Sequence, residues 1–376
     1  MSIKKNTLMI SRTLKAIIAS ISLLVSFPSW SIQTTHTIRP HTSFEGSSLS
    51  NSCSTMHSQS FSTRCNMALF PFQNNEGISL SIVGKSDGDS IDNGRDLIFD
   101  PITEDLLRKL FEETNYNSFT FNSEVSFKNS LFEITYIPYY LMADLYLFNP
   151  VFPEISMNLV NREELRLSSG FLLFGDGDLD KSLNLSMGSS LFYYSHTSAN
   201  TLFSLFDLSN TDAEELIKFN SKYGVSGDLS FFLSIPSDII PNFSIQYKNI
   251  ASRINRNEKL TNSSTRLETS YLFDDYLLLG LGKSYKTLYG RFSYNLEIPT
   301  ENYLSDTKFE HLNLGLNYTL KLLSLFMGLG QNYQTFGISF NSDQFKVGIS
   351  YSKEKDLGDF QESYDDSAYI GMAINL

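Results

Sequence analysis

Two short clusters of polar residues have the types and spacing that catalysis or metal binding would need. His196 lies two residues before Ser198, a spacing at which an imidazole can activate a serine hydroxyl. The match covers only three residues, and the pattern of loop lengths in the chain predicts a periplasmic turn there, away from outer-leaflet lipid. A polar turn is the simpler interpretation, so we expect no catalytic residue.

The second cluster is acidic. Asp176, Asp178 and Asp180 alternate as at the start of a calcium-binding loop. Lys181 stands where that loop requires glycine, and Met187 stands where it requires glutamate. We interpret the cluster as an acidic external turn, and we expect neither a bound metal nor a cofactor.

The chain contains two cysteines, Cys53 and Cys65. In an oxidising compartment such as the periplasm the two thiols can pair. A disulfide that closes so short a loop would stabilise the fold by about 3 kcal/mol in the chain-entropy model. The alternative is a pair of free thiols.

The N-terminus predicts export. Residues 16–27 form an apolar stretch after a basic segment, and Ser29 and Ser31 suit a cleavage site. We therefore expect residues 1–31 to be a cleaved signal peptide; the alternative is an uncleaved anchor. The apolar stretch is shorter than the roughly 20 residues that a membrane-spanning helix needs. The chain carries 41 acidic against 29 basic residues, which argues against nucleic-acid binding.

The elements that would position these residues are alternating segments of strand length. In residues 223–235, apolar residues such as Leu229 share one face and residues such as Ser230 share the other. The pattern recurs up to residues 368–376, with a small, mostly uncharged polar face and aromatic residues near strand ends. In lipid, only helices and closed barrels satisfy all their backbone hydrogen bonds. A membrane protein with these alternating segments is therefore predicted to be a barrel.

The sequence thus predicts an all-β fold, a transmembrane antiparallel β-barrel of about 14 strands, with a range of roughly 12–16. We assign residues 32–76 to an N-terminal periplasmic or plug segment and residues 77–376 to the barrel.

Loop lengths give the barrel an orientation, because bacterial barrels have short periplasmic turns and long external loops. We place Leu376 at the periplasm and work back along the chain. The predicted external loops are residues 353–365, 288–307 and 252–264, and the predicted periplasmic turns are residues 341–343, 274–276 and 236–242.

The N-terminal half is less regular. Its predicted strands include residues 154–161, 164–174, 181–194 and 199–208. Pro101 begins an amphipathic helix that ends at Thr114, with Leu106, Leu110 and Phe111 on its apolar face. This helix either folds into the lumen as a plug or lies in an external loop.

Pro138 interrupts the strand predicted over residues 131–147. Proline cannot donate a ladder hydrogen bond, so in sheets it is expected at edges, ends or bulges. Pro138 therefore marks either a kink that opens the wall laterally or a simple turn.

Several stretches together resemble the family of the long-chain fatty-acid transporter (FadL) and its TraF-like and PorV-like relatives. The core match runs from Gly227 through Asp228 to Phe232, continues at Pro236 and ends in residues 243–249 with Asn249. Near the N-terminus, Asn66-Met67-Ala68 is similar to the family's Asn-Pro-Ala element, with Met67 in place of the proline.

The resemblance implies an outer-membrane protein that passes small hydrophobic molecules. The alternative that it implies is a structural or assembly component of a conjugation or secretion system. Such a protein is expected to contact outer-membrane lipid and lipopolysaccharide, to be inserted by the barrel-assembly machinery through its C-terminal strand, and to bind a hydrophobic small-molecule ligand. That strand normally ends in Phe and ends here in Leu376.

Overall fold

In the computed structural model the chain divides after Thr37, and the second unit is Ile38–Leu376. Every residue that the structure describes belongs to the second unit. The described residues are 46, 48, 49, 52–56, 65–73, 76–87, 116–148, 154–204, 219–250, 276–301, 312–330, 333–342, 344–356 and 363–375. The predicted signal peptide and the predicted helix with Leu106, Leu110 and Phe111 lie outside them.

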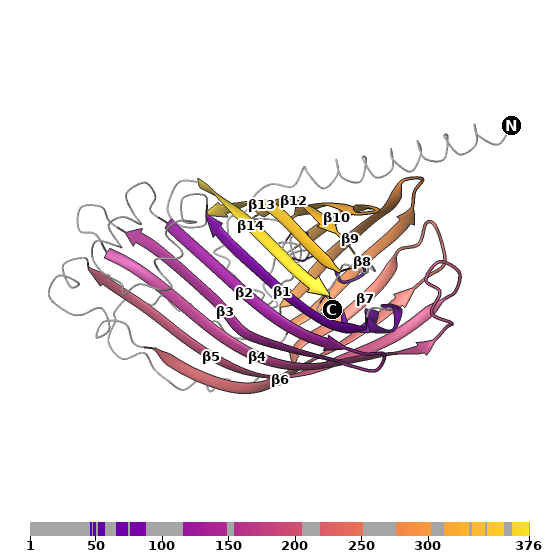
Figure 1. Cartoon of the computed structure of the whole chain (residues 1–376), viewed down its shortest axis with the longest axis horizontal. Helices are drawn as coiled ribbons and strands as arrows, with labels where there is room; N and C mark the ends of the chain where they lie inside the picture. The colour runs from indigo at the N-terminus through magenta and orange to yellow at the C-terminus, as the bar shows by residue number, and fades with distance from the viewer. Residues whose placement is uncertain are drawn as a thin grey trace. The chain divides into compact units, whose positions relative to one another are not determined.

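In this described part of the chain, 14 antiparallel strands close into a barrel (Figure 1). Each strand pairs with the next along the chain, and β1 pairs with β14 to complete the circle. The predicted all-β antiparallel barrel is confirmed. The elements are the 3-10 helix η1 (Met67–Phe72) and the strands β1 (Gly77–Asp87), β2 (Tyr116–Lys128), β3 (Glu133–Phe148), β4 (Glu154–Phe174), β5 (Asn184–Ser204), β6 (Asn220–Ser234), β7 (Asn242–Ile250), β8 (Tyr276–Lys286), β9 (Gly290–Glu301), β10 (Asn313–Leu320), β11 (Leu323–Leu329), β12 (Tyr333–Asn341), β13 (Phe345–Asp356) and β14 (Ser363–Asn375).

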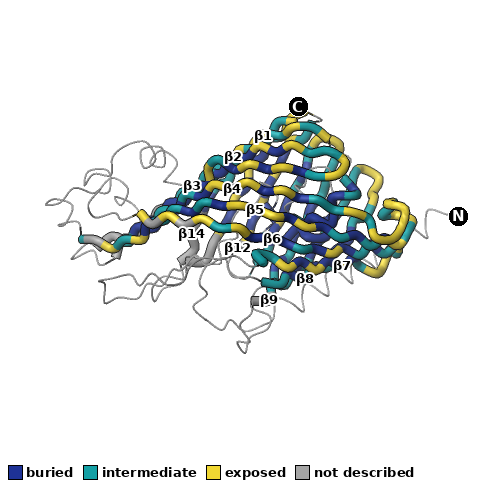
Figure 2. Tube along the Cα trace, turned by 90° about the horizontal axis from the view of Figure 1, so that it is seen from below, coloured by how far each residue is buried: buried dark blue, intermediate teal, exposed yellow. Residues whose placement is uncertain are grey.

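The strands turn polar side chains inward and apolar side chains outward. Along β7, for example, Ser244 and Gln246 are buried, while Phe243 and Ile245 alternate with them and are exposed. Figure 2 shows the same alternation of buried and exposed positions along the other strands. A soluble protein has the opposite arrangement, with apolar side chains inside and polar ones outside. The arrangement found here is that of a barrel whose exterior contacts lipid. The barrel is therefore a transmembrane barrel.

No helix among the described residues is both long enough and apolar enough to cross a membrane.

Strands β4 and β5 are longer than the sequence predicts. Each of them joins two segments that were predicted as separate strands. The apparent break in β4 falls at Arg162 and Glu163, the first two of three successive charged residues that interrupt the expected pattern. Arg162 and Glu164 face into the barrel and are buried, and their charges are paired with each other. Charged inward positions of this kind continue a strand and do not end it.

Short turns and the end of β14 lie at the same end of the barrel. The backbone N–H of Asn375 donates to the carbonyl oxygen of Gln344, in the β12–β13 turn, at 2.7 Å. Because successive strands are antiparallel, the other turns at this end follow from the strand order. They are residues 129–132, 175–183, 235–241, 287–289 and 321–322. We call this end the short-turn end.

Two of the loop predictions were wrong. The predicted external loop over residues 288–307 begins in a tight turn, where the N–H of Thr287 donates to the carbonyl oxygen of Gly290 at 2.7 Å, and continues as β9. The sequence pattern did not reveal this turn, because its central residues are apolar and turns are usually recognised by polar residues. The predicted turn over residues 274–276 is also wrong, because β7 pairs directly with β8 and Tyr276 begins β8.

Candidate functional site

Part of the N-terminal region lies inside the barrel, against the inward faces of the strands. We call residues 48, 49, 52–56 and 65–73 the inner segment. Its backbone passes close to glycines of the wall. A Cβ at Gly315 would clash with Ser52, and a Cβ at Gly188 would clash with the backbone of Met67 and Ala68. Glycine at these positions leaves the room that the inner segment occupies.

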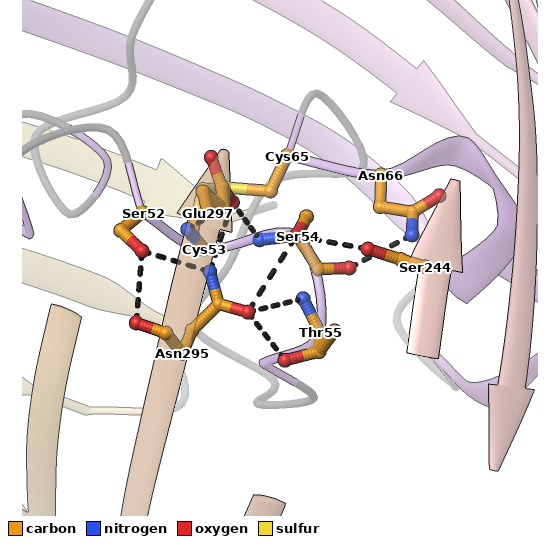
Figure 3. Close-up of a disulfide and its surroundings, with 9 residues drawn as sticks. All are labelled: Ser52, Cys53, Ser54, Thr55, Cys65, Asn66, Ser244, Asn295 and Glu297. Carbon is orange, nitrogen blue, oxygen red and sulfur yellow. Dashed lines mark hydrogen bonds between the residues drawn. A yellow bond between two sulfur atoms is a disulfide. The ribbon is translucent and has the colours of Figure 1, made fainter. Parts of the chain in front are cut away.

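Two neighbouring inward residues of β9, Asn295 and Glu297, hold the first part of the inner segment (Figure 3). Glu297 Oε1 accepts the backbone N–H groups of Cys53 at 2.8 Å and Ser54 at 2.6 Å. Asn295 Oδ1 accepts the N–H of Thr55 at 3.2 Å, and its Nδ2 donates to Glu297 at 2.9 Å. Only 1% of Glu297 is exposed. A carboxylate buried this deeply is stabilised by such N–H donors.

A disulfide joins the two parts of the inner segment. Cys53 and Cys65 are bonded, with their Cα atoms 5.5 Å apart. Beside the disulfide, Asn66 Nδ2 donates to the carbonyl oxygen of Ser54 at 2.8 Å (Figure 3). Apolar residues of the inner segment and the wall surround it; those that cluster with Cys53 and Cys65 are Leu49, Met56, Phe326, Val83 and Tyr369.

The second part of the inner segment contains η1, which packs on β4, β5 and β6. Asn66 caps this helix, because its Oδ1 accepts the N–H of Ala68 at 2.9 Å. The same N–H is 3.0 Å from Ser230 Oγ on β6, and Ser186 Oγ on β5 donates to the carbonyl oxygen of Ala68. The Phe72 ring meets that of Phe232 edge-on, with centroids 5.8 Å apart. Asn66 and Ala68 thus seat this part against the wall.

Beside η1, a chain of buried ion pairs crosses β4, β5 and β6. Arg166 contacts both Asp228 and Glu164 at 2.7 Å, and Arg162 contacts Glu164 at 2.6 Å. Ser190 Oγ of β5 also donates to Asp228 at 3.2 Å. Buried charges need partners of this kind, because an unpaired charge away from water is strongly destabilising.

The same carboxylate fixes an irregular backbone on β7. Asp228 Oδ1 accepts the N–H of Asn249 at 2.9 Å, and Asn249 has a φ of 58°. The β6–β7 register shifts at this point, between Gly227 and Leu229. Asparagine tolerates the left-handed conformation better than most residues. The two residues of the sequence motif, Asp228 and Asn249, are thus in direct contact.

Aromatic rings face the two arginines. The Arg166 guanidinium lies 4.1 Å from the centroid of the Phe192 ring, and that of Arg162 lies 5.0 Å from the centroid of the Tyr194 ring. Phe192 and Tyr194 are both buried on the inward face of β5. Cation–π contacts stabilise such pairs most when they are shielded from water.

Pro138 lies in a bulge of β3. On one side, the register with β4 shifts between Ile137, opposite Glu164, and Tyr140, opposite Arg162. On the other side, the register with β2 shifts between Ser123 and Val125. The bulge turns both Ile137 and Tyr140 inward. With Met142 and Val160 they form an inward-facing apolar patch, which we call the β3 patch.

The two clusters that could have suggested chemistry lie elsewhere. His196 is buried within β5, opposite Arg162, so the prediction that it lies in a turn was wrong. The acidic cluster lies in the β4–β5 turn at the short-turn end, which is the end of the C-terminal strand β14. The predicted strands placed it at the opposite end, because β5 was predicted as two strands. In the β4–β5 turn, a hydrogen bond from Lys181, 3.0 Å away, lowers the pKa of Asp178.

The structure therefore brings the cysteines, Asn66 and Ala68 together, and places Asp228 and Asn249 in contact nearby, while Pro138 lies on β3. Sequence reasoning missed Asn295 and Glu297, which hold the inner segment. The signal that could have found Glu297 is a charged residue at an inward position of an alternating strand. Arg162 and Arg166 carry the same signal.

No protein-family model matches the chain, and no curated protein does. Among solved structures, the toluene transporter TodX of Pseudomonas putida is similar, with a TM-score of 0.53 and 10% identity, over 89% of this chain and 98% of that one. A Pseudomonas aeruginosa FadL homologue matches with a TM-score of 0.45 and 9% identity, over 89% and 98% of the two chains. The monoaromatic hydrocarbon channel CymD gives 0.48 and 8%, over 88% and 97%. The likeness to TodX establishes a shared barrel fold.

Proposed function

We propose that this protein passes small hydrophobic molecules across the outer membrane. The observation that carries the proposal is the β3 patch. Ile137, Tyr140, Met142 and Val160 face inward and pack together as one apolar cluster beside the bulge at Pro138. They are 0–8% exposed, so a hydrophobic molecule gains contact with them when the wall opens at the bulge. A component that only supports an assembly would not require such a cluster, so we prefer transport to that alternative. TodX, which has a similar fold, is a toluene transporter, and this supports the same substrate class.

We propose that the inner segment acts as the plug of the barrel. It bonds to inward residues on strands far apart in the wall. Thr335 of β12 donates to the carbonyl oxygen of Ser48 at 2.8 Å, Ser244 of β7 bonds to Ser54 at 2.9 Å, and η1 lies on β4 to β6. A hydrophobic molecule that enters the lumen then needs an exit other than a straight path along the axis.

We propose that the bulge at Pro138 provides this exit, as a lateral opening beside the β3 patch. Two features support the choice. The bulge shifts the register of β3 with both of its neighbours, β2 and β4. Pro138 cannot donate a ladder hydrogen bond, which weakens the pairing where the opening would form.

The proposed location is the outer membrane of a Gram-negative cell, in contact with lipid and lipopolysaccharide. Residues 1–31 would be cleaved on export, and β14 would be the strand that the assembly machinery recognises. The closed antiparallel barrel with an apolar exterior supports this location, because such barrels are typical of bacterial outer membranes. We propose no catalytic activity.

Uptake of radiolabelled toluene by cells with and without the protein tests the proposal. We expect faster uptake with the protein. If cells with the correctly inserted wild-type protein take up toluene no faster than cells without it, the proposal that the protein transports this substrate class is wrong.

A variant of the bulge tests the proposed lateral exit separately from transport. Deletion of Pro138 removes the bulge, because Ile137 and Tyr140 both face inward with two residues between them, and one intervening residue restores regular alternation. We expect lower uptake from the deletion variant and a smaller decrease from Pro138→Ala. The matched control is Pro299→Ala, a proline of β9 in regular register opposite Leu278. Unchanged uptake by a folded deletion variant would disprove the lateral opening and leave the transport proposal standing.

A further inference from the structure

Large apolar side chains occupy the tips of the turns at the short-turn end of the barrel. Among the described residues, four of these turns carry them, and most of their surface is exposed. They are Leu131 (71%), Ile239 (84%), Leu288 (95%), Tyr289 (79%) and Leu322 (52%). We call these residues the apolar tips. We propose that the apolar tips are embedded in the interfacial layer of the membrane, in contact with lipid, while the charged part of the β4–β5 turn, residues 176–181, stays in water.

The β8–β9 turn shows most clearly that turn geometry does not explain these residues. Leu288 and Tyr289 are the two central residues of a hairpin turn closed by Thr287 and Gly290. Neither residue has a positive φ, so any residue type can adopt this backbone and the turn does not require large apolar side chains. Two large apolar residues there gain nothing from the turn and, in water, would expose nearly all their surface. Lipid contact removes that cost.

The turn backbones suit a layer that is poor in water. Asn129 Oδ1 accepts the N–H groups of Leu131 and Phe132, both at 2.8 Å. Ser237 Oγ accepts the N–H groups of Ile239 and Ile240, both at 3.3 Å. Backbone donors that leave water must find partners in the protein, and these side chains provide them within the turns.

The apolar tips also continue the lipid-facing surface of the strands. Phe127 points outward at the end of β2, and its ring lies 6.3 Å from that of Phe132, next to the tip residue Leu131. At the β12–β13 turn, which has no apolar tip among its described residues, the outward rings of Phe340 and Phe345 lie 5.8 Å apart. The exterior therefore stays apolar up to the turns.

The distribution of the tips around the barrel identifies the partner as lipid. The four turns join β2 to β3, β6 to β7, β8 to β9 and β10 to β11, and Phe174, at the end of β4, is 61% exposed between the first two of them. A protein partner or a second copy of the chain would contact one sector of such a ring. Lipid surrounds the whole barrel, so it fits a ring of apolar residues.

Tryptophan fluorescence tests the proposal directly. The chain has a single tryptophan, Trp30, which lies in the proposed signal peptide, and Trp30→Phe keeps the background silent whether that peptide is present or removed. In that background, Leu288→Trp and Leu322→Trp report on two tips. Leu191→Trp, an outward position of β5, is the lipid-facing control. Lys181→Trp is the aqueous control, because its side chain is 81% exposed in the acidic turn. The full-length folded proteins are reconstituted in phosphatidylcholine vesicles that contain lipid brominated either near the headgroup or near the chain end.

We expect both tip variants to be quenched by brominated lipid, more strongly by lipid brominated near the headgroup, while Lys181→Trp is not quenched. Heat-modifiability on gels establishes that each variant is folded, and Leu322→Trp serves if Leu288→Trp does not fold. If both tip variants remain unquenched while Leu191→Trp is quenched, the tips are in water or against protein, and the proposal is wrong. This outcome is independent of any transport measurement.

Discussion

Glu297 of β9 accepts the backbone N–H of Cys53 at 2.8 Å, and so ties the disulfide of the inner segment to the barrel wall. The same oxygen also accepts the N–H of Ser54. One buried carboxylate thus satisfies two adjacent backbone donors of a segment that lies far earlier in the chain. Attachment of this part of the inner segment depends on Glu297 together with its neighbour Asn295, whose Oδ1 accepts the N–H of Thr55.

We expect Glu297→Ala to detach the first part of the inner segment. The substitution leaves the N–H groups of Cys53 and Ser54 without this acceptor, and each unsatisfied buried donor costs about 1–3 kcal/mol. If the inner segment closes the lumen, the ionic conductance of single barrels in planar bilayers increases. Glu297→Gln is the control, because it keeps an acceptor oxygen, and its conductance should stay near that of the wild type. An unchanged conductance in folded Glu297→Ala would contradict the proposed plug.

The disulfide should make the inner segment resistant to detachment. Replacement of Cys53 and Cys65 together by serine removes a cross-link worth about 3 kcal/mol for a loop of this length. We expect proteolysis of the inner segment to become faster and conductance to increase. Treatment of the wild-type protein with a dithiol reductant should give the same changes, and the double variant should not respond to it. A response of the double variant would show that the reductant acts elsewhere.

Asn249 should be sensitive to the type of residue that replaces it. Its φ of 58° costs most residues roughly 1–2 kcal/mol. Asn249→Gly should leave the free energy of unfolding nearly unchanged, whereas Asn249→Val should lower it by at least that amount. Denaturant unfolding of the barrel in detergent micelles measures both variants. Equal stabilities of the Gly and Val variants would show that this backbone conformation does not occur in solution.

The buried ion pair between Arg166 and Asp228 should matter far more than an exposed one. Asp228→Ala leaves the Arg166 charge without one of its two carboxylates, and breaking a buried pair costs roughly 3–5 kcal/mol. Asp178→Ala, which breaks the exposed pair with Lys181, should leave the free energy of unfolding nearly unchanged, because solvent screens an exposed pair. The same unfolding measurement compares the two. Similar losses would mean that Asp228 is hydrated or that Arg166 has other partners in solution.

Much of the fold could be predicted because the alternation of apolar and polar residues maps directly onto the two faces of a barrel wall. The segment around Leu229 and Ser230 is an example, and β6 has the faces predicted for it. The errors have physical causes. Arg162 interrupts the polar face with a charge that is paired inside the barrel, so one strand was predicted as two. Leu288 and Tyr289 are apolar residues in a turn, so the turn was missed.

The candidate site was less predictable. Asp228 and Asn249 could be identified from the motif, and Cys53 and Cys65 from their position in an exported chain. Nothing in the sequence of β9, however, indicates that Glu297 binds a segment more than two hundred residues earlier. An inward polar residue has the same pattern whether it faces water or another part of the chain. Only the closed barrel brings these partners together.

The most direct test of the central proposal is a comparison of two solutes in the same cells. Radiolabelled toluene and a radiolabelled hydrophilic solute of similar size are supplied to cells with and without the protein. Passage along the β3 patch predicts that the protein accelerates the uptake of toluene but not that of the hydrophilic solute. Equal acceleration of both would indicate an open aqueous pore, and acceleration of neither, with the barrel folded in the outer membrane, would contradict the proposed function.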